Sequence, residues 1–271
     1  MKLEGKVAIV TGGGQGIGEG IVRCLADEGA DIAIIDINGD NARKVADEVK
    51  SQGRKALAIE ADITDNDKVV KAVQDTLDFF GKIDILVNNV GGYPLGDFEE
   101  SSGMSILDRT DKEWDGCYEL NLKTQVSMTR AVAPHLTRQK SGKIINISSV
   151  SARTPGGWLI CYATAKAGVV HFTRSLAREL AGNNINVNCI CPGVLYTPLW
   201  ERGCAALIER IPEAKGLTPR EFFDKFIAAP VPLGRPQTPE DIGHAVVFFA
   251  SEEAKNITGQ TLDIDGGSAF V

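Results

Sequence analysis

Near its start this chain of 271 residues reads Val7-Ala8-Ile9-Val10-Thr11-Gly12-Gly13-Gly14-Gln15-Gly16-Ile17-Gly18. The apolar run at the beginning is typical of a strand buried on both faces of a sheet. A glycine-rich turn follows and leads into a helical pattern from about Ile17 to Glu28. Glycines let the backbone approach a ligand closely, and a helix N-terminus offers unpaired N–H groups with a partial positive charge. The spacing Gly12-x-x-x-Gly16-x-Gly18 therefore predicts a pyrophosphate site, with a merely flexible loop as the alternative.

The same alternation of strand and helix continues along the chain. A second helix is expected from about Asp40 to Gln52, and further apolar runs occupy residues 32–35, 56–59, 83–87, 143–147 and 185–190. Such alternation implies right-handed crossovers between parallel strands. The pattern predicts an α/β fold over residues 1–271, a single-domain Rossmann-type doubly wound parallel sheet flanked by helices.

Two stretches are too long for plain connections between these elements. They run from Gly91 to Thr110 and from Leu195 to Pro239. Long excursions in compact α/β domains are usually binding loops or lids, and sometimes only decoration. We interpret residues 195–239 as a substrate lid, because ligands of such folds bind beyond the carboxyl ends of the strands.

Composition excludes several classes of function. Hydrophobic residues make up 43% of the chain, enough for a large core, and the formal net charge is −7. That charge opposes binding to nucleic acids or to anionic membrane surfaces. No apolar run approaches the roughly 20 residues that cross a bilayer. Without a visible signal peptide, we expect a cytoplasmic protein.

Metal binding is not expected either. The six cysteines and three histidines are scattered and form no recognisable ligand pair. In a chain without export signals, free buried thiols are the simplest interpretation of the cysteines.

Acidic and amide residues follow the predicted strands. Asp36 closes the second strand, 18 residues after Gly18, where a carboxylate can accept hydrogen bonds from ribose hydroxyls and repel a 2′-phosphate. It therefore predicts NAD rather than NADP, unless it merely caps a turn. Asp62 follows the third strand and either meets the adenine or caps the next helix. Asn88-Asn89-Val90-Gly91 ends the fourth strand and is expected to line the adenosine channel.

The chemistry is predicted from Tyr162-Ala163-Thr164-Ala165-Lys166. Positions i and i+4 share a helix face, so the phenol and the ammonium stand side by side. A nearby positive charge lowers a tyrosine pKa, which suits a general acid or base. An exposed Tyr/Lys pair is the alternative. Ser149, at the end of the fifth strand, and the helical Asn121 are candidates to act with this pair.

These motifs resemble those of the short-chain dehydrogenase/reductase family. The resemblance runs from Lys6 to Gly267 and rests on Thr-Gly-x-x-x-Gly-x-Gly, Asn-Asn-x-Gly, the helical Asn, Ser followed by Tyr-x-x-x-Lys, and Pro192-Gly193. Val90 departs from the family's usual alanine, and the second excursion is longer than in the shortest members.

The resemblance implies a role for each matching residue. Tyr162 would be the acid/base, Lys166 would lower its pKa and bind ribose hydroxyls, and Ser149 would hold the reacting oxygen. Asn121 would position a water that links Lys166 to solvent. Residues expected to bind NAD are Gly12, Gln15, Gly16, Ile17, Asp36, Asp62, Ile63, Asn89, Val90, Gly91, Tyr162, Lys166, Pro192, Gly193, Val194 and Thr197.

The substrate is predicted less sharply. Residues 154–161, with Trp158, and an apolar lid of balanced charge favour an apolar or cyclic secondary alcohol, although lid residues also pack on the body. The lid's apolar residues include Tyr196, Leu199, Trp200, Leu207, Ile208, Ile211, Phe222, Phe223, Phe226 and Ile227. The alternatives are a carbonyl reductase of the 3-oxoacyl carrier type and a non-catalytic dinucleotide sensor. Family resemblance also implies a homotetramer.

Overall fold

The computed structural model describes residues 1–94, 105–155 and 159–269, and its centre is one parallel sheet of seven strands. The order is β3-β2-β1-β4-β5-β6-β7, so the chain winds outward from β1 in both directions. This topology confirms the predicted doubly wound fold. The strands are β1 (Val7–Thr11), β2 (Asp31–Asp36), β3 (Ala56–Glu60), β4 (Ile85–Asn88), β5 (Gly142–Ile147), β6 (Ile185–Pro192) and β7 (Thr261–Ile264).

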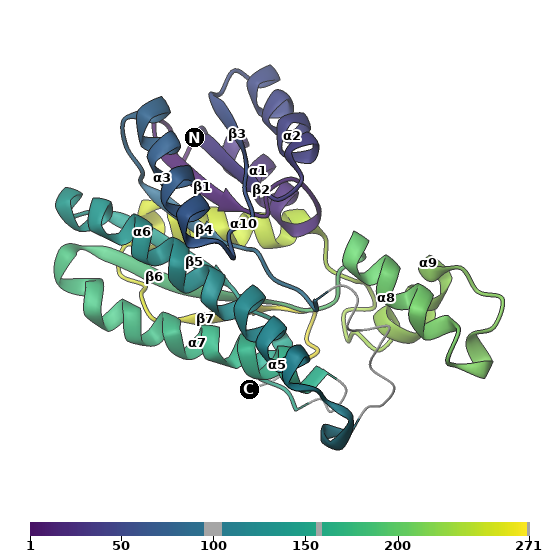
Figure 1. The fold of residues 1–271 in the computed structure, drawn as a ribbon. Coiled ribbons are helices and arrows are strands. Elements are labelled where there is room, and N and C mark those ends of the chain that lie inside the picture. The colour runs from purple at the N-terminus through teal and green to yellow at the C-terminus, as the bar shows by residue number, and fades with distance from the viewer. Residues whose placement is uncertain (95–104, 156–158, 270–271) are drawn as a thin grey trace.

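Helices cover both faces of the sheet (Figure 1). The α-helices are α1 (Gly16–Asp27), α2 (Gly39–Ser51), α3 (Asn66–Phe80), α5 (Asp111–Tyr118), α6 (Thr124–Gln139), α7 (Ile160–Leu180), α8 (Pro198–Ile208), α9 (Pro219–Phe222) and α10 (Pro239–Ala250). Two π-helical segments are η2 (Glu119–Lys123) and η7 (Phe223–Ala228). Short 3-10 turns are η1 (Ile106–Asp108), η3 (Val150–Ala152), η5 (Ala181–Asn183), η6 (Pro212–Ala214) and η8 (Glu252–Ala254).

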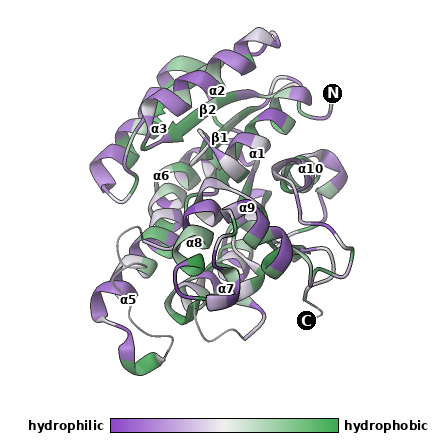
Figure 2. Cartoon of the chain, turned by 90° about the vertical axis from the view of Figure 1, so that its right-hand side faces the viewer, coloured by the Kyte–Doolittle hydropathy of each residue, from purple (hydrophilic) through white to green (hydrophobic). Residues whose placement is uncertain are grey.

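Alternate residues of each central strand supply two separate cores. Val10 and Ile34 pack with α1, α2 and α10, whereas Ile9 and Ile35 pack with α3, α6 and α7. Because both faces are covered, the central strands carry continuous apolar runs, which is the pattern that made them recognisable. Figure 2 shows this contrast between the hydrophobic strands and the mixed surfaces of the helices.

The seventh strand is the one that the sequence pattern did not predict. Thr261-Leu262-Asp263-Ile264 alternates polar and apolar residues, and Leu262 is 37% exposed. This edge strand has one neighbour, β6, and lacks the apolar run by which the other six strands were recognised. The fourth strand begins at Ile85, two residues later than expected, and extends to Asn88.

The second excursion folds as a small body of its own. Figure 1 shows α8 and α9 set to one side of the sheet and its helices. The buried residues of this lid form a separate apolar cluster around Phe222 and Phe223. The rings of Tyr196 and Trp200 lie 5.2 and 5.7 Å from that of Phe223. Residues 95–104 of the first excursion, and Trp158, lie outside the described residues.

Candidate active site

A cleft of about 750 Å³ lies at the carboxyl ends of the strands. The loops after β1, β2, β3, β4, β5 and β6 contribute to it, and residues of η2, α7 and α8 complete its walls. Of the predicted site residues, all except Asn121 line this cleft. Its walls also include residues that the sequence did not single out: Ile37, Thr64, Gly92, Tyr93, Leu120, Ser148 and Arg202.

The glycine turn forms one end of the cleft. Gly12 and Gly16 have φ values of 62° and 57°, in the left-handed region that favours glycine. A Cβ on Gly18 would collide with the Gly12 carbonyl oxygen, so α1 can approach the turn only with glycine at that position. Gln15 precedes α1 and provides no side-chain cap, which leaves the first N–H groups of the helix facing this end of the cleft. The turn therefore has the features of an anion cradle.

Asp36 lies beside this turn and is 5% exposed. One carboxylate oxygen accepts the Gly14 N–H at 2.9 Å, and the other accepts the Asn38 N–H at 2.9 Å. Each oxygen retains acceptor capacity for a hydroxyl donor. Asp62 accepts the Thr64 N–H and hydroxyl instead of capping α3, whose cap is Asp65. Of the two interpretations of Asp62, the helix cap is thus wrong.

The end of β4 is locked to the end of β1. Asn89 donates its side-chain amide to the carbonyl oxygens of Thr11 and Gly12, at 3.0 and 3.2 Å. Its backbone N–H donates to the Thr11 hydroxyl at 2.9 Å. A polar side chain at this position therefore fixes the shape of the turn as well as lining the cleft.

Lys166 and Tyr162 lie on α7 as the i, i+4 spacing predicted. Lys166 is 2% exposed, and its Nζ donates to the carbonyl oxygen of Ile147 at 3.0 Å. The same Nζ lies 5.7 Å from the centre of the Tyr162 ring. Ser149 is 8% exposed, two residues beyond Ile147, and lines the same cleft. The phenol, the hydroxyl and the ammonium are therefore grouped at one place.

The protonation of this group differs from the prediction. Burial raises the pKa of Tyr162 to about 12, and hydrogen bonding with Ser149 offsets this only in part. Burial also lowers the pKa of Lys166 to about 8. The net pKa of Tyr162 is therefore raised rather than lowered, because burial is the largest influence on it.

Asn121 lies behind the cleft wall and is fully buried within η2. Its amide donates to the carbonyl oxygens of Gly92 and Cys117, at 2.8 and 2.9 Å, and its oxygen accepts the Gly92 N–H at 2.8 Å. A Cβ on Gly91 would come within 2.6 Å of Lys166 Nζ and 2.7 Å of Asn121 Oδ1. Glycine is thus required where these two polar groups meet, and π-helical turns often mark functional sites.

Another part of the cleft lining is the segment Pro192-Gly193-Val194 at the end of β6. A Cβ on Gly193 would lie 2.5 Å from Gln237 Oε1, so this segment packs tightly on the residues behind it. Thr197 caps α8 by accepting the Trp200 N–H at 3.5 Å, and it lies next to Gly16 of the glycine turn. The lid therefore begins directly above the anion cradle.

The lining of the cleft also includes large apolar and aromatic side chains: Tyr93, Leu159, Trp200 and Leu207. Most other aromatic and aliphatic residues of the lid pack against one another. The alternative considered above was packing on the body of the protein. Packing within the lid instead accounts for most of the apolar residues that its sequence contains.

Within the described ranges, no helix has both the length and the apolar character that crossing a bilayer requires. In the same part of the chain, no three or more His, Cys, Asp or Glu side chains gather as a metal site would need.

The chain was compared with known proteins. A model of the short chain dehydrogenase family matches residues 6–205. Oxidoreductase UcpA of Salmonella typhimurium is 38% identical over 272 residues, which cover 99% of this chain and 96% of that protein. The 3-oxoacyl-(acyl-carrier-protein) reductase FabG of Thermotoga maritima is 33% identical over 267 residues, with 98% and 99% covered. A structure of 7α-hydroxysteroid dehydrogenase with NADH and 7-oxo glycochenodeoxycholic acid matches with a TM-score of 0.83 and 32% identity, over 98% of this chain and 95% of that one.

The burial of Lys166 predicts a pH-dependent cost in stability. Below about pH 8 the lysine is charged in both states, and the folded state carries the whole desolvation cost. As the pH rises toward the ordinary lysine pKa of about 10.4, that cost disappears. Lys166→Met should therefore raise the free energy of unfolding by on the order of 3 kcal/mol at pH 7, less the lost hydrogen bond, and by far less at pH 10.

Denaturant unfolding at the two pH values measures the difference. Lys44→Met, at an exposed position of α2, is the matched control and should change the free energy of unfolding little at either pH. If Lys166→Met raised the free energy of unfolding equally at pH 7 and pH 10, the lowered pKa of Lys166 would be contradicted.

Proposed function

Because this chain belongs to the short-chain dehydrogenase/reductase family of oxidoreductases, we propose that it is an NAD-dependent enzyme that interconverts secondary alcohols and ketones. The observation that carries this proposal is the grouping of Tyr162, Ser149 and Lys166 in one cleft whose other end is the glycine turn. A proton-transfer group and an anion cradle in the same cleft suit a dinucleotide and a substrate held together.

The residues present fit a dinucleotide. The left-handed glycines and the uncapped start of α1 suit a pyrophosphate, and Asp36 suits ribose hydroxyls. The carboxylate would repel a 2′-phosphate, so we propose NAD rather than NADP. Asp62 and Ile63 would lie toward the adenine, Asn89 and Val90 along the adenosine, and Pro192, Val194 and Thr197 toward the nicotinamide. When bound, NAD accepts or supplies the hydride of the reaction.

The chain's own residues would control the proton. Ser149 and Tyr162 would hold the reacting oxygen, and Tyr162 would exchange a proton with it. Lys166, still largely protonated at neutral pH, would bind ribose hydroxyls and stabilise the phenolate that forms when Tyr162 gives up its proton. With its raised pKa, Tyr162 is protonated at neutral pH in the ligand-free structure, which is the state that can donate a proton to a ketone oxygen.

We propose that the substrate is an apolar or cyclic secondary alcohol. Leu159, Trp200 and Leu207 in the cleft wall support this, since apolar walls gain by covering apolar substrate surface. The 7α-hydroxysteroid dehydrogenase to which the chain is similar is complexed with a steroid acid, a cyclic compound of this kind.

A second candidate is a 3-oxoacyl carrier reductase, favoured by the similarity to FabG. Carrier proteins and their phosphate linkers are anionic, so a docking face for them would be basic. The net charge of −7 opposes this alternative, and Asp36 favours NAD.

We also propose a cytoplasmic homotetramer. The exposed edge strand β7, with Leu262 at its surface, supports contact with another copy, because unpaired edges recruit further strands or are covered. Sedimentation equilibrium should give the mass of four chains, and a monomeric mass would contradict the proposal.

Tyr162→Phe tests the proton role. Removing the hydroxyl should lower kcat by roughly 100-fold or more, because general acid–base catalysis contributes about that factor. NAD binding, followed by protein fluorescence, should remain near normal. Tyr118→Phe, on the exposed side of α5, is the matched control. Turnover within about twofold of the unchanged protein would remove Tyr162 from the proposal.

Asp36→Ala tests the choice of cofactor. Without the carboxylate, the ratio of kcat/KM for NAD to that for NADP should fall by roughly tenfold or more, since both ribose hydrogen bonds and the repulsion of phosphate are lost. The same change also releases the N–H groups of Gly14 and Asn38. Asp40→Ala, at the exposed start of α2, controls for a general loss of acidic charge. An unchanged ratio would show that selectivity resides elsewhere.

A further inference from the structure

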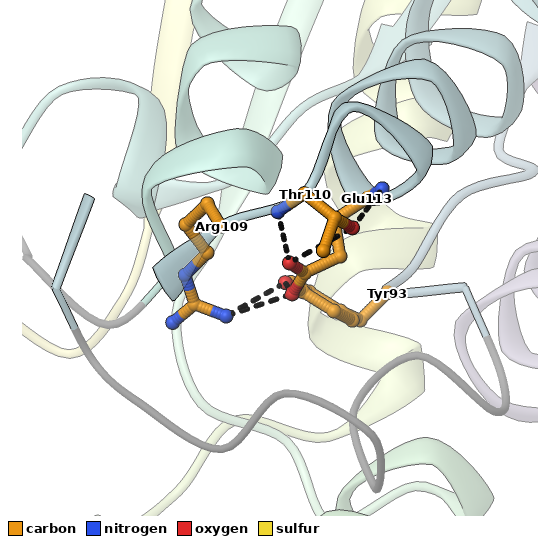
Figure 3. Close-up of polar contacts among 4 residues, drawn as sticks. All are labelled: Tyr93, Arg109, Thr110 and Glu113. Carbon is orange, nitrogen blue, oxygen red and sulfur yellow. Dashed lines mark hydrogen bonds and ion pairs between the residues drawn. The ribbon is translucent and has the colours of Figure 1, made fainter. Parts of the chain in front are cut away.

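Tyr93, Arg109 and Glu113 form a buried polar cluster beside the cleft (Figure 3). Arg109 Nη1 lies 2.9 Å from Glu113 Oε1, and the side chains are 4% and 3% exposed. The Tyr93 hydroxyl donates to Glu113 Oε1 at 2.9 Å and accepts from Arg109 Nη1 at 3.2 Å. The three groups therefore close a triangle of charge-assisted hydrogen bonds.

Glu113 also holds the start of α5. Its Oε2 accepts the Thr110 N–H at 2.9 Å, and the Thr110 hydroxyl accepts the Glu113 N–H at 3.3 Å, which together form a capping box. Burial alone would raise the pKa of Glu113, but hydrogen bonds from Thr110, Arg109 and Tyr93 outweigh it and lower the pKa. The carboxylate is thus ionised and held from both sides.

A buried ion pair is a poor way to gain stability, because removing two charges from water costs about as much as their attraction returns. What this pair does provide is a defined geometry, since both oxygens of Glu113 and the Tyr93 hydroxyl have set hydrogen-bond partners. The role of this ion pair follows from its position beside the cleft.

The cluster lies against the proposed catalytic helix. Tyr93 lines the cleft and packs in one apolar group with Cys117 of α5 and Cys161 of α7, against which Tyr162 also packs. The adjacent Gly92 peptide is bonded to Asn121 in both directions. The Tyr93 hydroxyl is turned to the ion pair (Figure 3), so the residue is held at its far end while it forms part of the cleft wall.

We propose that Tyr93 is a specificity-determining residue of the cleft, and that the Arg109–Glu113 pair is the positioning element that holds it. The wall beside Tyr162 would then be rigid and apolar, and would favour secondary alcohols with a bulky or cyclic apolar group on that side of the carbinol carbon. This inference rests on the proposed function, because it concerns which alcohols the same site accepts.

The experiment compares two substrates in each variant. They are the largest cyclic and the smallest acyclic secondary alcohol that the unchanged protein oxidises with NAD, and the readout is the ratio of their kcat/KM values. Tyr93→Ala removes the ring and should lower the ratio by about tenfold, the scale of discrimination in an apolar pocket. Tyr93→Phe keeps the ring but removes the hydroxyl that bonds to Glu113 and Arg109. Glu113→Gln removes the charge that faces Arg109. Both should lower the ratio less, by about threefold, with KM for NAD unchanged.

Tyr118→Phe again serves as the control and should leave the ratio as it is. A ratio unchanged in Tyr93→Ala and Tyr93→Phe would overturn this inference while leaving the proposed function intact, even if the variants melt at lower temperature. Failure of the unchanged protein to oxidise any secondary alcohol would overturn the proposed function and this inference with it.

Discussion

The hydrogen bond from the Lys166 ammonium to the Ile147 carbonyl holds the whole site together. It joins α7 to the end of β5, and so sets Tyr162, one turn earlier on α7, near Ser149, two residues beyond Ile147. Gln125 donates to the same carbonyl at 3.1 Å and is itself buried. Within the described residues, no carboxylate forms an ion pair with Lys166. The ammonium therefore depends on a backbone dipole, and burial lowers its pKa.

The fold was predictable because its signal is local and repeated. Central strands such as Ile32–Ile35 are apolar without interruption. This pattern is typical of a sheet that is covered on both faces. The edge strand β7 was not predicted because Thr261-Leu262-Asp263-Ile264 alternates polar and apolar residues. The i, i+4 pair of Tyr162 and Lys166 was predictable from helix geometry alone, but their protonation was not, because it depends on how much protein covers each group.

The Tyr93 cluster could not be predicted from the sequence. Tyr93 is 16 residues from Arg109, and no spacing rule joins them. An arginine followed by a glutamate four positions later suggests an exposed helical pair, whereas here both side chains are buried. Only the capping box, Thr110 with Glu113, was available as a local signal, and it indicates the start of a helix rather than a role beside the cleft.

The lid's own apolar cluster has a consequence for how this chain tolerates change. Since Phe222 and Phe223 pack with residues of the same excursion, the lid's internal contacts are nearly independent of those under the sheet. A substitution among the buried residues of that cluster should therefore disturb the lid first, while the cradle and the proton-transfer group keep their own contacts. The wall that α8 adds to the cleft can thus be altered without disturbing the packing of the sheet.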